Sequence, residues 1–153
     1  MPSPEIFIDA DACPVKDETY KVARRYGLKT WVVSNAFIMI PTSPLIERVI
    51  VEAGPDVADD WIAEHVKPGD VVVTNDIPLA ERVLRAGAAA LTPAGKPFTE
   101  NSIGSAIAQR ALMEQLRSTG DIYGGPRPFD RNDRSAFLQS LDQIVSKSLR
   151  SPR

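Results

Sequence analysis

The sequence predicts an α/β fold in which a mainly parallel central sheet lies between layers of helices. Two observations lead to this prediction. Short strand-like segments alternate with helix-like segments between residues 6 and 91, and the strand over 71–74 is apolar enough to be buried on both faces. The chain has 153 residues, which suits one domain, and we expect segment 120–153 to pack on that domain as a loop and a C-terminal helical arm.

The first strand and helix are short and clearly bounded. Residues 6–8 form an apolar run that ends at polar residues. Pro14 favours the start of a helix, because its missing N–H is not needed in the first turn. Apolar side chains then recur at helical spacing until Gly27, a residue type that commonly ends helices. Residues 30–33 are rich in β-branched and aromatic side chains and predict the second strand.

The middle of the chain continues this alternation. Acidic residues at the start of the helix over 57–66 suit the positive end of its dipole, and Gly87 suits the end of the next helix. The predicted segments are a loop over 35–44, a strand over 47–51, a helix over 57–66, a strand over 71–74, a helix over 78–86 and a strand over 88–91.

Two longer amphipathic helices are predicted over residues 103–116 and 135–149, separated by a loop rich in Gly, Pro and Arg over 120–132. The expected core side of the first helix consists of Ile103, Ile107, Leu112 and Leu116. The apolar side of the second helix consists of Phe137, Leu141, Ile144 and Val145.

Composition limits the classes of partner. The formal net charge is −2, so no global basic field draws the chain to nucleic acid, and any such contact must use a local patch. Cys13 is the one cysteine and cannot form an internal disulfide, as expected in a reducing compartment. The chain opens without a basic signal-peptide region and has no apolar run of roughly 20 residues. We therefore expect a cytoplasmic protein without a membrane partner.

Acidic residues follow the predicted strands at the edge of the sheet where ligands bind in parallel α/β folds. Asp9 and Asp11 follow the first strand, Asp76 follows the strand over 71–74, and Asp59 and Asp60 lie near the start of a helix. Because residues i and i+2 of an extended segment face the same side, we expect the first two carboxylates to converge.

Carboxylates held together repel one another unless a cation compensates their charge. The cations that prefer oxygen ligands are Mg²⁺ and Mn²⁺, which lower the pKa of bound water and hold a phosphodiester for hydrolysis. Each acid also has a simpler explanation as a helix cap, a turn residue or a residue favoured by a helix dipole. These explanations apply to Asp9 and Asp11, to Asp56, to Asp59 and Asp60, and to Asp76 before Pro78.

Several runs of this sequence resemble the acid-bearing helix, the strand-Thr-x-Asp signature and the first strand of PIN-like nuclease domains. The runs are Asp59-Asp60-Trp61-Ile62, Val71-Val72-Val73-Thr74-Asn75-Asp76 and Ile6-Phe7-Ile8-Asp9. A closer resemblance, over nearly the whole chain, is to the YaiI/YqxD family. It rests on Asp9-Ala10-Asp11-Ala12-Cys13-Pro14, Asp56-Val57-Ala58-Asp59, Thr74-Asn75-Asp76-Ile77-Pro78-Leu79-Ala80 and Gly124-Gly125-Pro126.

The PIN resemblance implies a three-layer α/β/α domain and a Mg²⁺- or Mn²⁺-dependent nuclease that hydrolyses phosphodiesters, RNA in preference to DNA. It assigns the metal-binding acids to Asp9, Asp59 and Asp76 and a supporting hydroxyl to Thr74. Further residues expected at the site are Asp11 as a fourth catalytic acid, with Asn35 and Asp60 in support.

The opening segment also resembles the Asp-x-Asp motif of haloacid-dehalogenase-like phosphatases. In that interpretation Asp9 is the nucleophile and Asp11 the acid and base. The run Val32-Val33-Ser34-Asn35 resembles their second motif. Cys13, however, stands where those enzymes usually carry Thr or Val, and no lysine clearly matches their third motif.

A third interpretation is an RNA-binding or regulatory module that keeps the fold without catalysis. Such a module should bind nucleic acid equally well with and without a divalent cation. In either nucleic-acid interpretation, Arg127 and Arg131 in the 120–132 loop are the residues expected to meet phosphates. A solvated loop followed by a basic tail explains the same residues equally well, so both explanations stay open.

Overall fold

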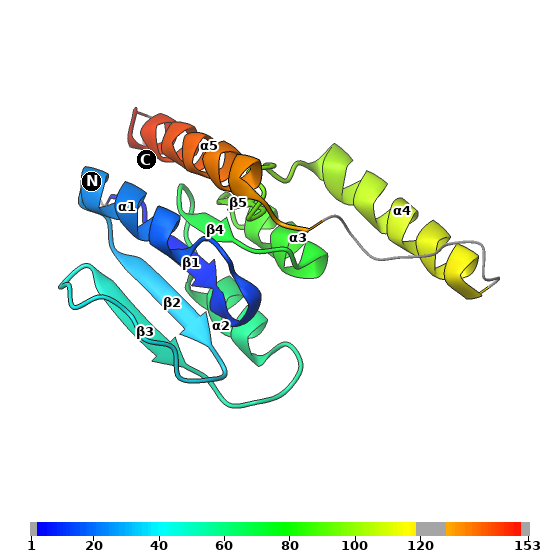
Figure 1. Cartoon of the computed structure of the whole chain (residues 1–153), viewed down its shortest axis with the longest axis horizontal. Helices are drawn as coiled ribbons and strands as arrows, with labels where there is room; N and C mark the ends of the chain where they lie inside the picture. Colours follow the sequence, from blue (N-terminus) through cyan, green and yellow to red (C-terminus); the bar gives the residue numbers. More distant parts are fainter. Residues whose placement is uncertain (1–2, 119–127, 151–153) are drawn as a thin grey trace.

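The computed structural model describes residues 3–118 and 128–150 of the chain. At its centre lies a parallel sheet with the strand order β3-β2-β1-β4-β5 (Figure 1). The strands are β1 (Ile6–Asp9), β2 (Thr30–Ser34), β3 (Ile46–Ile50), β4 (Val71–Val73) and β5 (Ala89–Leu91). The predicted parallel α/β fold is therefore confirmed, and each predicted strand is present to within a residue or two.

Helices cover both faces of this sheet. Helices α1 (Lys16–Tyr26) and α5 (Arg131–Arg150) lie on one face, and α2 (Val57–His65) and α3 (Ile77–Arg85) lie on the other (Figure 1). Helix α1 ends as expected at Gly27, whose φ of 67° places it in the left-handed region. The arrangement is a three-layer α/β/α sandwich.

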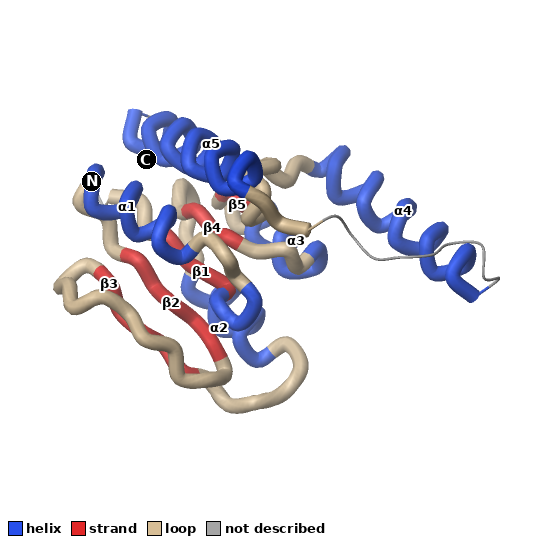
Figure 2. The backbone as a smooth tube through the Cα atoms, in the orientation of Figure 1, coloured by secondary structure: helices blue, strands red, loops and turns tan. Residues whose placement is uncertain are grey.

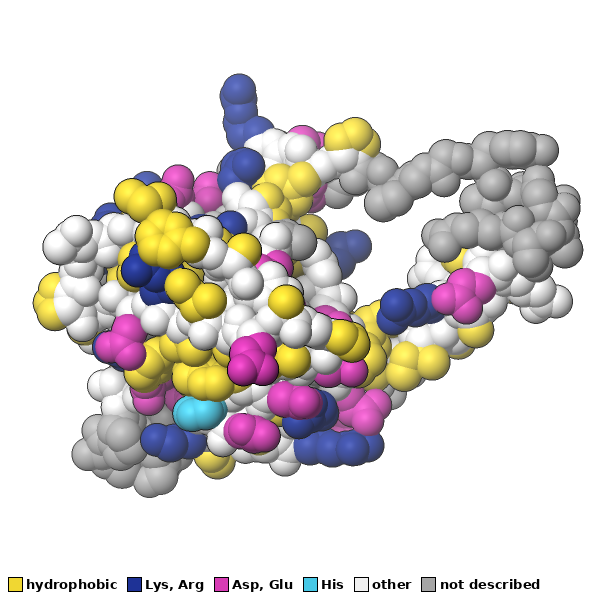
Figure 3. Space-filling view, turned by 90° about the horizontal axis from the view of Figure 1, so that it is seen from below, with side chains coloured by type: hydrophobic (Ala, Val, Ile, Leu, Met, Phe, Trp, Pro, Cys, Tyr) yellow, Lys and Arg dark blue, Asp and Glu magenta, His cyan; other side chains and the backbone are white. Residues whose placement is uncertain are grey.

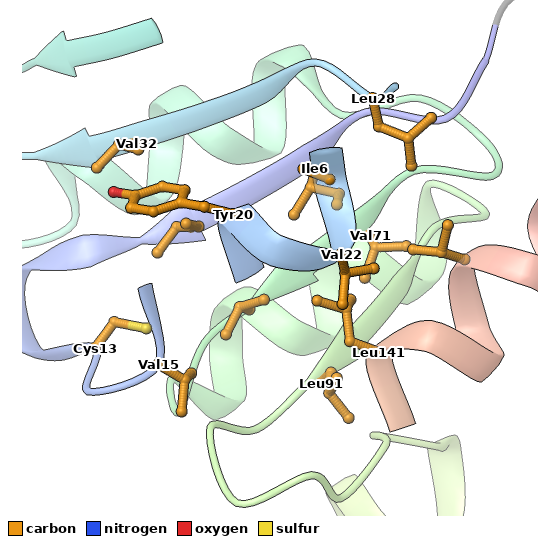
Figure 4. Packing of buried hydrophobic residues seen from close by; sticks show 14 of the residues in the cluster. Ile6, Cys13, Val15, Tyr20, Val22, Leu28, Val32, Val71, Leu91 and Leu141 are labelled. Atoms are coloured by element: carbon orange, nitrogen blue, oxygen red, sulfur yellow. The ribbon is translucent and has the colours of Figure 1, made fainter. Parts of the chain in front are cut away.

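Side chains of the central strands alternate between two apolar clusters, as the period of two in a strand requires. Ile6 and Ile8 pack on the side of α1 and α5, whereas Phe7 between them packs on the side of α2 and α3. Figure 4 shows the first cluster, to which α5 contributes Leu141 and β4 contributes Val71. Burial on both faces explains the continuous apolar run of β4.

The connection from β2 to β3 contains no helix in the described residues (Figure 2). Ile38 and Ile40 of this connection pack against the apolar cluster under α1 and α5. An irregular segment thus covers part of the sheet face that a crossover helix would otherwise cover. This agrees with the predicted loop over 35–44. On the next strand, Ile50 is 52% exposed at the edge of the sheet.

Helix α4 (Glu100–Ser118) corrects one prediction. It contacts α3 near its start and then extends away from the rest of the structure (Figure 1). Of its predicted core side only Ile103 is buried, whereas Ile107 is 50% exposed and Leu112 is 54% exposed. The helical period was right, but the second half of the helix has no described layer to pack against.

Helix α5 is also longer than predicted. It begins at Arg131, so the end of the predicted loop over 120–132 is helical, and residues 120–127 of that loop lie outside the described residues. The reciprocal hydrogen bonds between Asp130 and Asp133, each 3.0 Å from backbone N to carboxylate oxygen, explain the early start. Among the described helices, none combines the length and the apolar character needed to cross a membrane.

Candidate active site

The strand order reverses between β1 and β4, and at such a switch point the carboxyl ends of neighbouring strands diverge to leave a crevice. Ile8 is paired with Val73, so the next row of the sheet contains Asp9 and Thr74. Phe7, two residues before Asp9, packs on the side of α2 and α3. The alternation of strand side chains therefore turns Asp9 and Thr74 toward the same two helices.

Thr74 links the two strand ends. Its hydroxyl donates to Asp9 Oδ2 at 2.8 Å and accepts from the backbone N–H of Asp76 at 2.9 Å. Thr74 itself is buried, at 2% exposure. The hydroxyl thus uses its donor and an acceptor position to hold one acid and to orient the residue that carries another. Thr74 therefore joins the ends of β1 and β4 beside the acids.

Asp76 has two roles. Its Oδ1 atom accepts from Leu79 N at 2.8 Å, so Asp76 is the N-cap of α3, as the simpler explanation supposed. The same side chain also lines the cleft at the switch point. Capping uses one carboxylate oxygen and fixes the direction of the other. A cap and a site residue are therefore compatible here.

Asp59 lies in the first turn of α2 and faces the same cleft. Its pKa is raised to about 7, first by burial, then by the charges of Asp76 and Asp9 and by a hydrogen bond with Asp76. The pKa of Asp9 is also raised, chiefly by burial. The hydrogen bond from Thr74 acts in the opposite direction, and the charges of Asp76 and Asp11 add smaller upward contributions. Carboxylates from neighbouring elements thus raise the proton affinity of Asp9 and Asp59.

Asp11 reaches the cleft by a different route from the one predicted. It lies in a 3-10 turn, η1 (Ala10–Ala12), not in an extended segment, so the i, i+2 argument was wrong. Its two carboxylate oxygens instead accept from the backbone N–H of Asn35, each at 3.1 Å. Neither Asp9 nor Asp11 caps α1, whose N-cap is Val15 without a side-chain bond.

The cleft has a volume of about 890 Å³. Its acidic lining consists of Asp9, Asp11, Asp56, Asp59 and Asp76. Asn35 and the buried Cys13 also line it, and burial raises the pKa of the Cys13 thiol, which argues against a nucleophilic thiolate. The N-terminal ends of α2 and α3 carry Asp59 and Asp76 into the cleft, where the helix dipoles favour anionic groups.

Three residues expected at the site either lie elsewhere or fall outside the described residues. Asp60 forms an ion pair with Arg82, 2.7 Å from Nη1 to Oδ1, and does not line the cleft. Ile62 is buried, and a helix brings its i−3 neighbour Asp59, not Asp60, to the same face. The helical period could therefore have separated the two acids. Arg131 is exposed at the first residue of α5, and Arg127 lies outside the described residues.

Sequence reasoning missed two residues that line the cleft. Asp56 precedes α2 with a φ of 68° and was assigned only a turn or cap role. Its side chain makes no capping hydrogen bond, and its charge contributes to the raised pKa of Asp59. The second is Arg110 of α4, a basic residue far along the chain from every acid of the cleft. Only the packing of α4 brings Arg110 here, so no local pattern identified it.

Residues 7–147 match a family model described as "Uncharacterized BCR, YaiI/YqxD family". A UPF0178 protein of Caulobacter vibrioides is 62% identical over 146 residues, which covers 95% of each chain. A UPF0178 protein of Rhodopseudomonas palustris is 59% identical over 145 residues, 95% of this chain and 92% of the relative. One of Bradyrhizobium diazoefficiens is 58% identical over 142 residues, 93% of this chain and 85% of the relative. No solved structure matches the chain.

Proposed function

The chain belongs to the YaiI/YqxD family, and from this starting point we propose that it is a PIN-like nuclease that hydrolyses phosphodiester bonds in RNA with Mg²⁺ or Mn²⁺. One observation carries the proposal. Asp9 from β1, Asp59 from α2 and Asp76 from the start of α3 line a single cleft at the switch point of a parallel sheet. These are the three positions that the PIN resemblance assigns to metal-binding acids.

The donor chemistry of the cleft fits a hard cation, since five aspartates supply carboxylate oxygens to its lining. Within residues 3–118 and 128–150, no three His, Cys, Asp or Glu side chains are already placed to hold one ion together. Mg²⁺ commonly keeps several water ligands and binds through one or two carboxylates with substrate phosphates. Asp9 and Asp76, held in place by Thr74, are the pair that would hold such an ion.

When bound, such an ion neutralises phosphate oxygens and makes water a better nucleophile. The residues of the chain orient the acids and transfer the proton. Thr74 keeps Asp9 in one orientation, and the α3 cap keeps Asp76 in another, so the acids are organised before substrate arrives. Asp59, the third acid of the cleft, is placed to accept the proton that a water molecule loses as it attacks phosphorus and to return it to the leaving oxygen.

The phosphatase alternative requires Asp11 to act as a general acid and base. In that mechanism Asp11 must exchange protons with the substrate, but both of its oxygens accept the N–H of Asn35. This contact favours a positioning role for Asp11, in which it ties η1 to the end of β2. The strand order does not separate the alternatives, because it is shared by many doubly wound folds. We therefore separate them by substrate.

The test is cleavage of a labelled single-stranded oligoribonucleotide by the whole chain, with Mn²⁺ or with EDTA. We expect Mn²⁺-dependent cleavage, weaker action on the DNA analogue and little phosphate release from small monoesters. Asp9→Asn should lower cleavage by more than about a hundredfold. The matched control is Asp17→Asn, an exposed acid in the first turn of α1.

Rapid monoester turnover that beryllium fluoride inhibits strongly would replace the nuclease with a phosphatase, because this anion mimics a phosphorylated aspartate. RNA binding that is equal in Mn²⁺ and EDTA, without cleavage, would favour the silent binding module.

A further inference from the structure

A second hollow adjoins the acidic cleft, between α3 and α4. Its volume is about 390 Å³, and it is lined by Ile77, Pro78, Glu81, Arg82, Ile107 and Arg110. Ile77 and Arg110 line both the hollow and the cleft, so the two spaces meet at these side chains. A chain-like ligand that occupies the cleft can therefore continue into the hollow.

The charge of the lining changes sign between the two spaces. The cleft carries five aspartates with Arg110 at its border, whereas the hollow carries Arg82, Arg110 and one carboxylate, Glu81. That carboxylate is paired with Arg85, 2.6 Å from Oε1 to Nη2. Arg82 is paired in turn with Asp60, so Arg110 supplies the positive charge of the hollow beside the negatively charged cleft. Figure 3 shows acidic and basic side chains next to one another on this side of the structure, close to where α4 leaves it.

Arg110 is the side chain best placed to use this change of sign. It is exposed, and no hydrogen bond or ion pair in the described part of the chain engages its guanidinium, although five carboxylates share the lining with it. Helix α4 thus presents the guanidinium beside the acids without neutralising them. A guanidinium presents paired N–H donors that match the oxygens of a phosphate.

Arg82 also lines the hollow, and an ion pair fixes the orientation of its guanidinium. Asp60 holds its Nη1 atom at 2.7 Å, which orients the guanidinium at the hollow. Asp60, which the sequence led us to expect at the metal site, therefore positions the guanidinium of Arg82 next to that site. Between the two arginines, Ile77, Pro78 and Ile107 supply apolar surface for a sugar or a base.

We propose that this hollow binds the phosphate next to the one being cleaved, with Arg110 as its principal contact, and that the substrate is an oligonucleotide with two or more phosphodiesters. The inference rests on the proposed nuclease function and specifies its substrate class. A single phosphodiester would use the acidic cleft alone, whereas a longer strand would use both spaces.

Equilibrium binding and cleavage test this proposal separately. The first probe is a fluorescent single-stranded oligoribonucleotide, titrated with the whole chain in EDTA and in Mn²⁺ between 50 and 200 mM salt. Arg110→Ala should weaken binding about tenfold and reduce the log–log salt slope by about 0.7, the value for one contact on a single strand. Arg110→Lys should restore part of both. Arg24→Ala, which removes an exposed arginine of α1, should change neither.

The second probe compares kcat/KM for the oligoribonucleotide with that for a small aryl phosphodiester. Arg110→Ala should lower only the first value. An equal loss on both substrates would show that Arg110 acts at the cleaved phosphate, and no loss in either probe would remove it from substrate binding. If the wild type binds the strand and shows the Arg110 effect but does not cleave, the proposed nuclease function fails while the phosphate site stands. Failure of the wild type to bind the strand would overturn the phosphate site itself.

Discussion

The two ends of the sheet carry cavities of similar size but opposite chemistry. The cleft at the carboxyl end measures about 890 Å³ and is lined by five aspartates. The hollow at the amino end measures about 790 Å³ and is largely apolar, with Leu84, Phe98 and Ile144 in its lining. Each end also contains carboxylates that are shielded from solvent, Asp70 fully at the amino end and Asp9, Asp59 and Asp76 in part at the carboxyl end, so acidity and volume alone do not separate them.

The difference lies in the groups that surround each carboxylate, which are backbone donors at one end and other carboxylates at the other. Asp70, at the amino end, is 3% exposed, and its two oxygens accept the backbone N–H groups of Glu5 and Lys67 at 2.9 and 2.8 Å. At the carboxyl end, Asp9 and Asp59 face other carboxylates, and their pKa values are raised. A carboxylate bonded by backbone donors stabilises the fold, whereas crowded carboxylates are held in place at a cost and can bind a cation or a proton.

The largest effect is expected from a substitution that removes Asp70, the acid whose charge is compensated by backbone donors. Asp70→Ala should lower the free energy of unfolding by about 3 kcal/mol, because it leaves two backbone donors without their charged acceptor. Asp59→Asn should leave stability unchanged or raise it, because it removes like-charge repulsion. Urea denaturation of both variants provides the measurement. A similar loss in the two variants would show that both ends use their acids structurally.

The next effect comes from divalent cation. At pH 7.5, Mn²⁺ at a hundred times its dissociation constant should stabilise the wild type by about 2.7 kcal/mol, visible as a rise in Tm. Asp76→Asn should abolish this rise and keep the fold, because asparagine is also a good N-cap for α3. Asp70→Asn is a matched substitution at the other end and should retain the Mn²⁺ response. An undiminished rise in Asp76→Asn would remove Asp76 from the metal site.

A smaller effect is expected from pH in the absence of metal. The folded chain keeps a proton on Asp59 up to a pKa of about 7, whereas the unfolded chain loses it near 3.8. Between these values the unfolded state binds fewer protons, so stability falls as pH rises. Tm measured in EDTA between pH 4.5 and 8 should therefore decline, and Asp59→Asn should flatten the decline. Part of the slope should remain, since the pKa of Asp9 is raised as well. A variant with the full wild-type slope would contradict this account.

Most of the fold follows from local sequence signals. Apolar runs, β-branched residues and helix-ending glycines located the five strands and the helices packed on them, because in this region local preference and burial agree. The prediction for α4 failed on Ile107 and Leu112, which are exposed. An apolar stripe shows which side of a helix could be buried, but the presence of a neighbour to bury it is a tertiary property.

The site was predictable to the extent that it depends on strand ends. Asp9 and Asp76 follow directly from the rule that ligands bind beyond the carboxyl ends of parallel strands, whereas Thr74 was expected only from the PIN resemblance. Asp59 could have been distinguished from Asp60 by the helical period, as its i+3 neighbour Ile62 is buried. The 3-10 turn that carries Asp11 depends on backbone geometry that no spacing rule supplied.

The smallest expected effect concerns basic residues outside the proposed phosphate site. Lys67 lines the amino-end hollow, and β1, whose 4 residues span roughly 13 Å, separates that end from the cleft. Because this exceeds the Debye length of about 10 Å at 0.1 M salt, Lys67→Ala should leave oligoribonucleotide affinity and its salt slope unchanged. Arg131, exposed at the start of α5 and expected from the sequence to meet phosphates, should contribute a slope of at most about 0.7.

Anisotropy titrations from 50 to 200 mM salt would rank the three basic positions by the loss of oligoribonucleotide affinity that each alanine substitution causes. If the strand follows the acidic cleft and the adjoining hollow, the loss should be greatest for Arg110→Ala, smaller for Arg131→Ala and absent for Lys67→Ala. Equal losses at Lys67 and Arg131 would mean that nucleic acid is attracted to both ends of the sheet, and the division between a binding end and a structural end would fail. Because each variant removes one exposed cation, a difference among them reports position and not net charge.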